Sequence, residues 1–210
     1  ERSTPHFLLS VHKSLVSTVI GTLIGDGLLA SDKTVDTYVP ELKNSAHAGT
    51  TVRQALDMLS AVEYSYLPNG AQKPTFAAHK EAVHPAAPYL NVPVGSQEFV
   101  LQLSKRDCEH GECMHYKESD PAILIWAAER VTGKRFATLV EERLWSKIGA
   151  EFAIETVCDL RGFWTHYVSA TAVDLARWGQ MIVEGGFSNG QLVVPPAFLK
   201  DVRERASIEL

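Results

Sequence analysis

The chain has 210 residues, and its 45% hydrophobic and 21% charged residues are typical of globular proteins rather than disordered, fibrous or membrane proteins. Its 20 basic and 25 acidic residues give a formal net charge of −5, and no block of Lys and Arg supplies the positive surface that a nucleic-acid partner requires. No apolar run approaches the roughly 18 to 20 residues that cross a bilayer, so we expect no membrane segment in this chain.

A chain of this length can bury one sizeable core, and we expect a single domain over residues 1–210. The polar opening, ERSTPH, lacks the order of charged, apolar and small residues found in a signal peptide. Because the sequence begins with Glu1 rather than Met, trimming would explain this opening, and the compartment stays open. The three cysteines are too few for a disulfide scaffold, and their odd number mildly favours a reducing compartment.

Apolar residues recur with helical spacing in the first part of the chain, at positions 15, 16, 19, 20, 23 and 24. This pattern predicts a helix that is buried along one broad face and ends at Gly25. Residues 33–43 read as extended and turn-like, since Pro40 interrupts any helix, and Thr51 is a suitable N-cap for a short second helix. Five prolines lie within residues 64–96, which we expect to form a long loop.

The remaining chain shows more helical than strand-like patterns. Helices are expected, in chain order, at residues 15–24, 51–59, 121–131, 136–148, 170–184 and 198–204. Strand-like runs are few, and the better ones are residues 99–103 and 191–194. The chain by itself therefore reads as mainly α.

Ser10 and Lys13 form an S-x-x-K pattern at the start of the first helix. Residues three apart share one helical face, so the lysine amine can reach the serine hydroxyl. Serine is a weak nucleophile that needs a neighbouring base, and lysine can serve where apolar surroundings favour its neutral amine. The pattern alone carries little weight, because a helix-capping Ser10 and a solvated Lys13 explain it equally well.

The sequence around this pattern is more specific. Residues 7–27 (FLLSVHKSLVSTVIGTLIGDG), 38–42 (YVPEL) and 51–60 (TVRQALDMLS) closely resemble the serine β-lactamase-like, or penicillin-recognising, family. Matching segments continue in the same order at residues 111–116, 124–133, 144–150 and 170–179. Within the family, the resemblance is nearest to class C β-lactamase-related esterases and 6-aminohexanoate-dimer hydrolases.

The resemblance implies a β-lactamase/transpeptidase-like α/β parent fold, of which this chain holds chiefly the helical region. It also implies Ser10 as nucleophile, Lys13 as its activating partner, and Tyr116 as a second proton-moving group. Glu118 stands where the family has Asn or Ser for substrate contact, so that contact is in doubt and the local charge around Lys13 differs. Tyr66 is the other candidate for substrate binding.

Three further patterns offer alternatives. Tyr89-Leu90-Asn91 is a literal Y-x-N element, but it lies between prolines with no following helix, so we favour Tyr116. Cys108 and Cys113, with the nearby His110 and His115, offer four zinc ligands or a disulfide. Their spacing is unlike that of common zinc sites, and we expect no metal and unpaired cysteines. His12 should point away from the face shared by Ser10 and Lys13.

Relatives complete the site with a Lys/His-x-Gly motif on a sheet-edge strand near the C-terminus, and no such motif is expected before Leu210. The chain thus resembles part of a cofactor-independent serine hydrolase that cleaves a small-molecule amide or ester through an acyl-enzyme. The alternative is a non-catalytic fragment or binding module of the same fold. The sequence does not distinguish β-lactam, D-alanyl peptide, short ester and aminohexanoate substrates, because loops select the substrate in such families.

Overall fold

The computed structural model describes residues 2–64, 81–83 and 94–205. The helices are α1 (Val11–Gly25), α2 (Val35–Tyr38), α3 (Val52–Leu56), α5 (Ser96–Gln102), α6 (Ser119–Thr132), α7 (Phe136–Val140), α8 (Ala172–Val183) and α9 (Pro196–Arg205). A 3₁₀ turn, η1 (Pro40–Asn44), and a π-helical turn, η3 (Glu141–Trp145), join them. The strands are β1 (Pro5–Phe7), β2 (Glu155–Cys158), β3 (Trp164–Thr171), β4 (Phe187–Ser188) and β5 (Gln191–Leu192).

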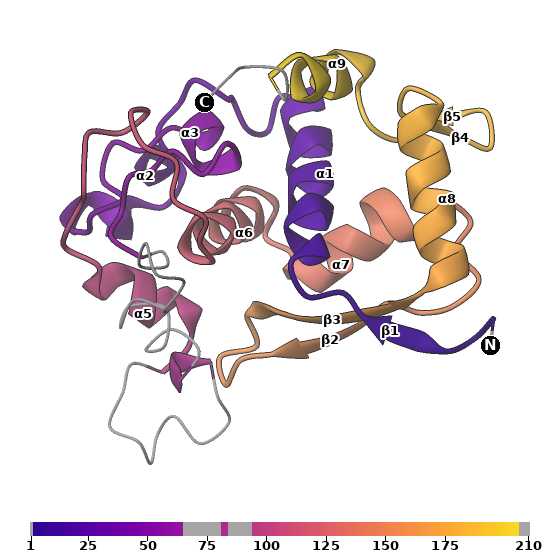
Figure 1. Ribbon diagram of the computed structural model, residues 1–210, viewed down its shortest axis with the longest axis horizontal. Coiled ribbons are helices and arrows are strands. Elements are labelled where there is room, and N and C mark those ends of the chain that lie inside the picture. The colour runs from indigo at the N-terminus through magenta and orange to yellow at the C-terminus, as the bar shows by residue number, and fades with distance from the viewer. Residues whose placement is uncertain (1, 65–80, 84–93, 206–210) are drawn as a thin grey trace.

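Helix α1 lies at the centre of the structure, beside α6 and above a small sheet (Figure 1). Its residues Leu15, Val19, Ile20 and Leu23 are fully buried, so the helix is covered on most of its circumference. A helix that is apolar nearly all round is stable only inside a core. The helical prediction for residues 15–24 is confirmed, and the helix starts four residues earlier, at Val11.

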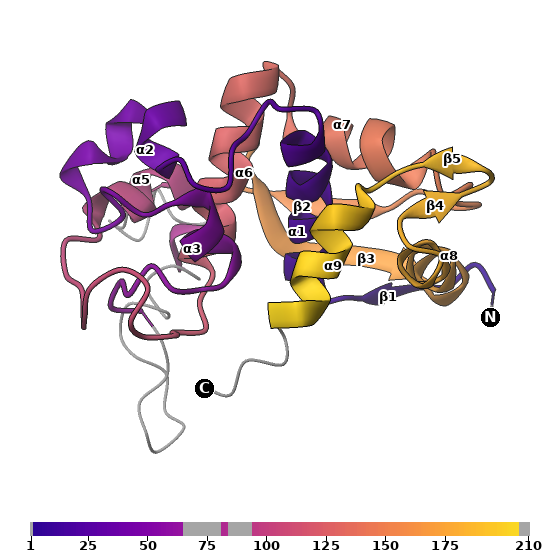
Figure 2. The ribbon, with the colours of Figure 1, turned by 90° about the horizontal axis from the view of Figure 1, so that it is seen from above.

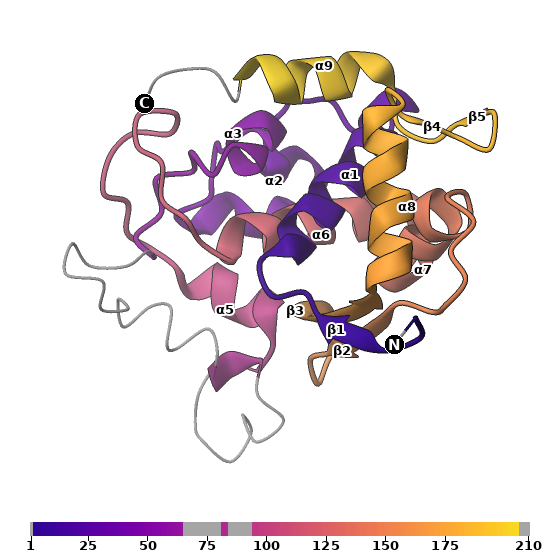
Figure 3. The ribbon, with the colours of Figure 1, turned by 45° about the vertical axis from the view of Figure 1, so that its right-hand side comes forward.

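The sheet positions the start of α1. Its three strands are antiparallel in the order β1-β3-β2, and Phe7 of β1 pairs with Ser169 of β3. Figure 3 shows β1 leading from the sheet directly into α1. Strands β1, β2 and β3 were not predicted from the sequence. In β3, buried residues do not alternate with exposed ones, so the period that marks a half-buried strand is lacking.

Some of the expected elements are confirmed and others are wrong. Thr51 caps α3, and its side chain accepts from the Gln54 N–H at 3.1 Å. Residues 99–103 are not a strand, since most of them belong to α5, where burial of Phe99, Val100 and Leu103 follows helical spacing. Residues 33–43, expected to be extended and turn-like, are turn-like but not extended: the single-turn helix α2 ends at Tyr38, and Pro40 begins a 3₁₀ turn, where its missing N–H costs nothing.

Helix α9 crosses the C-terminal end of α1, as Figures 1 and 2 show. The crossing is close because two glycines of α1 lie beneath it: Gly21 meets the ring of Phe198, and Gly25 meets Pro195. Within the described part of the chain, no helix combines the length and apolar character that a bilayer crossing requires.

Candidate active site

Ser10 lies where the chain turns from the sheet into α1. The N–H of Leu8 still bonds to β3, at 2.8 Å from the Val168 oxygen, and Leu9 then takes a left-handed conformation with φ of 48°. That conformation costs a non-glycine residue roughly 1–2 kcal/mol, and such strain is often found beside functional groups. Ser10 itself is exposed, and its side chain makes no hydrogen bond to the described residues and does not cap α1.

The N–H of Ser10 itself is not used in the backbone hydrogen bonds of the turn. The N–H groups of residues 11–13 donate to the carbonyls three positions earlier, at 3.0, 3.2 and 3.1 Å. No carbonyl of the described residues accepts from the N–H of Ser10. This N–H is therefore a backbone donor that can bind a developing negative charge.

Lys13 lies one turn along α1 from Ser10 and is buried, with 9% of its surface exposed. Its Nζ is 4.7 Å from the centre of the Tyr116 ring, which comes from the segment before α6. Burial of Lys13 and the absence of a Ser10 cap contradict the alternative of a capping serine beside a solvated lysine. The structure thus places Ser10, Lys13 and Tyr116 at one end of α1.

Glu118 is the residue before α6, and both of its carboxylate oxygens are occupied. The Lys13 ammonium donates to Oε1, and His12 Nε2 lies 3.2 Å from Oε2. Burial alone would raise the pKa of Glu118, but the hydrogen bond and charge of His12, with the charge of Lys13, lower it to about 2. The carboxylate is therefore ionised and faces α1.

The expectation that His12 points away from the face of Ser10 and Lys13 needs correction. Consecutive helical residues lie about 100° apart, so a carboxylate placed between them reaches both side chains. Glu118 does this with His12 and Lys13. Of the other tyrosines considered, Tyr66 and Tyr89 lie outside the described residues.

A second polar cluster is buried next to the segment that carries Tyr116. Lys117 and Asp120 are 1% and 0% exposed, with Lys117 Nζ 3.6 Å from Asp120 Oδ2. Asp120 also accepts a 2.6 Å hydrogen bond from the hydroxyl of Ser60, in the loop after α3. Burial lowers the pKa of Lys117 and raises that of Asp120 to about 6. This cluster anchors the Tyr116 segment to the core and was not anticipated from the sequence.

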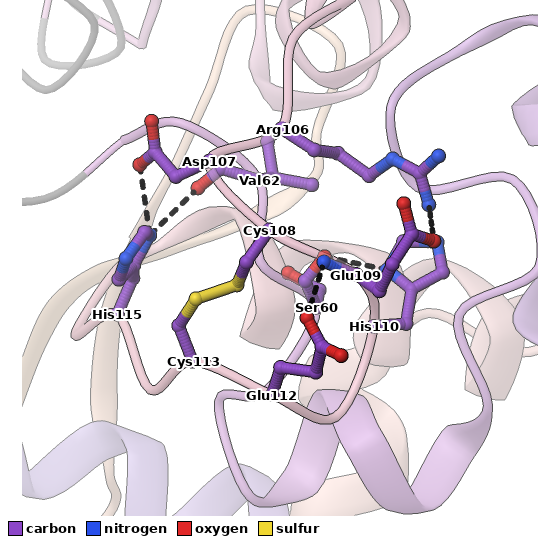
Figure 4. Close-up of a disulfide and its surroundings, with 10 residues drawn as sticks. All are labelled: Ser60, Val62, Arg106, Asp107, Cys108, Glu109, His110, Glu112, Cys113 and His115. Carbon is purple, nitrogen blue, oxygen red and sulfur yellow. Dashed lines mark hydrogen bonds and ion pairs between the residues drawn. A yellow bond between two sulfur atoms is a disulfide. The ribbon is translucent and has the colours of Figure 1, made fainter.

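Cys108 and Cys113 form a disulfide, so the expectation of unpaired cysteines is wrong. The loop between them folds back on itself, with a 3.1 Å bond from the Glu112 N–H to the Glu109 oxygen and a positive φ at Gly111. The two Cα atoms are thereby 6.3 Å apart, within the range that a disulfide spans. Figure 4 shows the disulfide closing this loop.

The disulfide loop is also fixed by His110. Its Nδ1 is 2.6 Å from the Ser60 carbonyl oxygen, and its Nε2 is 2.8 Å from that of Ala48. His115 contacts the Asp107 carboxylate, at 3.2 Å, rather than His110 (Figure 4). In the part of the chain that the structure describes, no three His, Cys, Asp or Glu side chains are grouped so as to hold a metal ion.

Comparison with known proteins finds relatives in both sequence and structure. A 6-aminohexanoate-dimer hydrolase from Paenarthrobacter ureafaciens is 34% identical over 208 residues, which are 97% of this chain and 52% of that protein. A solved structure from Bacillus anthracis, provisionally assigned as a 6-aminohexanoate-dimer hydrolase, is 30% identical with a TM-score of 0.84, covering 97% of this chain and 54% of its own. The chain thus spans about half the length of the relatives it matches.

More distant solved structures share the fold. A D-stereospecific amidohydrolase from Streptomyces sp. is 16% identical with a TM-score of 0.65, covering 94% of this chain and 64% of its own. The family model described as beta-lactamase matches residues 1–208. The expected β-lactamase/transpeptidase-like fold is confirmed, and the chain belongs to the beta-lactamase family.

Proposed function

We propose that the protein is a serine hydrolase that cleaves an amide or ester bond of a small molecule through an acyl-enzyme on Ser10. The observation that carries this proposal is the placement of an exposed Ser10 one helical turn from a buried Lys13, whose ammonium lies against Tyr116. The relative at 34% identity is named as a 6-aminohexanoate-dimer hydrolase, which supports a hydrolytic reaction.

In the first step, the Ser10 hydroxyl oxygen attacks the carbonyl carbon of the substrate. Its proton passes to the neutral amine of Lys13, directly or through the Tyr116 phenol. The new C–O bond forms as the carbonyl oxygen takes up negative charge, and the Ser10 N–H donates to that oxygen. Lys13 then gives its proton to the departing amine or alcohol as the C–N or C–O bond breaks.

Water completes the cycle. It attacks the acyl-enzyme carbonyl and loses its proton to Lys13, and that proton returns to the Ser10 oxygen as the acid product leaves. These steps need no metal or organic cofactor. Glu118 and Tyr66 are the two predicted substrate-binding residues. Glu118 already contacts two side chains of α1, so we propose that it supports Lys13 instead of binding substrate. Tyr66 stays a prediction.

The test is covalent labelling of the chain by a serine-reactive fluorophosphonate, followed by intact-mass measurement. We expect a single adduct that is lost in Ser10→Ala and kept in Ser14→Ala, the matched control one turn along α1 at another exposed serine. Tyr116→Phe should slow labelling about 100-fold, as removal of an acid–base group typically does. A folded chain that never forms the adduct would favour the non-catalytic binding module instead.

A further inference from the structure

One carboxylate from α6 lies between two cationic side chains of α1. The Lys13 ammonium bonds to one oxygen of Glu118, and the His12 imidazole faces the other at 3.2 Å. His12 is 2% exposed, Lys13 is 9% exposed, and the Glu118 side chain is 13% exposed. Because little water reaches these groups, the charge of each one strongly affects its neighbours.

The contacts of His12 determine which of its ring nitrogens carry protons. Nδ1 is 2.9 Å from the carbonyl oxygen of Leu9, which only accepts hydrogen bonds. Nε2 faces the ionised carboxylate of Glu118, which also only accepts. A neutral imidazole has a single N–H and cannot donate to both, so the geometry fits an imidazolium.

The surroundings of His12 contain few other titratable groups. It lines a cavity of about 20 Å³, room for one water. Among the residues that the structure describes, Glu118 and His166 of β3 are the other titratable groups around that cavity. The ring centres of His12 and His166 are 6.2 Å apart, too far for a direct hydrogen bond. On its own helix, His12 adjoins Lys13. Glu118 is therefore the anion that faces His12.

The charges of His12 and Glu118 affect how easily Lys13 loses its proton. With both cations protonated, the cluster has two positive charges and one negative charge. When Lys13 loses a proton, an imidazolium and a carboxylate remain as a balanced pair. If His12 were neutral, loss of that proton would leave Glu118 as a buried anion without a counter-ion, which is unfavourable.

We propose that His12 is a positioning residue: as an imidazolium it is a second counter-ion of Glu118 beside Lys13. It thereby allows Lys13 to release the proton that it must lose before accepting one from Ser10. The inference rests on the proposed function, in which Lys13 is the base. It assigns a role to the second variable position of this chain's S-x-x-K pattern and to the carboxylate at Glu118.

The proposal predicts shifts in opposite directions for two neutral substitutions. In His12→Gln, Lys13 is the sole counter-ion of Glu118 and holds its proton more tightly. In Glu118→Gln, two cations adjoin without an anion, so Lys13 gives up its proton more easily. The rate of Ser10 labelling rises with pH over part of the profile. This rise should occur about one pH unit higher in His12→Gln and about one pH unit lower in Glu118→Gln, which is a tenfold change in rate at a given pH within it.

The experiment measures the rate constant of fluorophosphonate labelling from pH 5 to 10 in the wild-type chain and both variants. His6→Gln, at an exposed histidine of β1, is the matched control and should leave the pH of this rise unchanged. Thermal unfolding confirms that each variant is folded. A purely structural role of His12 would lower the rate at every pH without changing the pH of this rise, and that outcome, or a shift of both variants in one direction, overturns the proposal.

A second measurement separates this proposal from the proposed function. Nitrogen NMR of the histidine rings, with His12 assigned from its loss in His12→Gln, should show both ring nitrogens protonated at pH 7 in the wild type. A neutral His12 overturns the positioning role even if Ser10 is labelled. An imidazolium in a folded chain whose Ser10 is never labelled at any pH rejects the proposed function and, with it, the role of His12 in catalysis.

Discussion

The ring of Phe198 lies so close to Gly21 that a Cβ added to this glycine would come within 2.6 Å of two ring carbons. Real Cβ atoms do not approach so closely, so a side chain at this position would push α9 away from α1. Gly179, in α8, is a helical glycine with open space around it, since an added Cβ there would meet no atom within 4 Å.

The two glycines predict stability changes of opposite sign. Gly21→Ala should lower the free energy of unfolding by about 1–3 kcal/mol through overpacking. Gly179→Ala should raise it by about 0.5–1 kcal/mol, because alanine loses less backbone entropy in a helix. Urea denaturation of both variants measures the changes. Equal effects at the two positions would contradict the close packing of α9 on α1, and Phe198→Leu should partly rescue Gly21→Ala.

His47 predicts a loss of stability in acid. Its ring is fully buried, and neither ring nitrogen has a hydrogen-bond partner among the described residues. Burial, with the positive charges of Lys117 and His110, lowers the pKa of His47 to about 3, below the ordinary value of 6.5. The unfolded chain therefore binds one more proton between these values. The stability due to neutral His47 is complete above pH 6.5 and is lost as the pH falls toward 3.

His47→Gln removes this titration. As the pH falls below 6.5, the wild type should lose about 1.4 kcal/mol of unfolding free energy per pH unit relative to the variant. Using the difference matters because Asp120, with a pKa raised to about 6, has the opposite effect: its contribution falls as the pH rises from 3.8 to 6. Urea denaturation of both proteins from pH 4 to 8 measures the difference in unfolding free energy. Parallel curves for the two proteins would show that folding does not change the pKa of His47.

The disulfide between Cys108 and Cys113 predicts a sensitivity to reductant. Its loop of six residues leads directly to the Tyr116 segment, and chain-entropy arguments give such a loop about 2 kcal/mol of stabilisation. The double variant Cys108→Ser, Cys113→Ser should lose about this much, and dithiothreitol should lower the Tm of the wild type to that of the variant. Cys158→Ser, at the exposed free cysteine, is the control and should change the free energy by less than about 0.5 kcal/mol.

Some structural elements were predictable because their signals are local. The apolar spacing from Leu15 to Ile24 and the Thr51 cap each depend on residues within a few positions, and both are found in the structure. The strand expected at residues 99–103 was wrong because its Phe, Val and Leu residues suit a buried helix face as well as a strand. The sheet was missed because edge strands such as β1 become strands only by pairing with β3.

The sequence by itself identified the pattern that holds Ser10 and Lys13, since three-residue spacing and a helix start are local properties, and it named Tyr116 by resemblance. Only the tertiary structure decided what surrounds Lys13. The bonds of Glu118 to His12 and Lys13 join residues more than 100 positions apart. The protonation states at this site depend on burial and on the charges that packing of α6 against α1 brings together, and no local pattern encodes that distance.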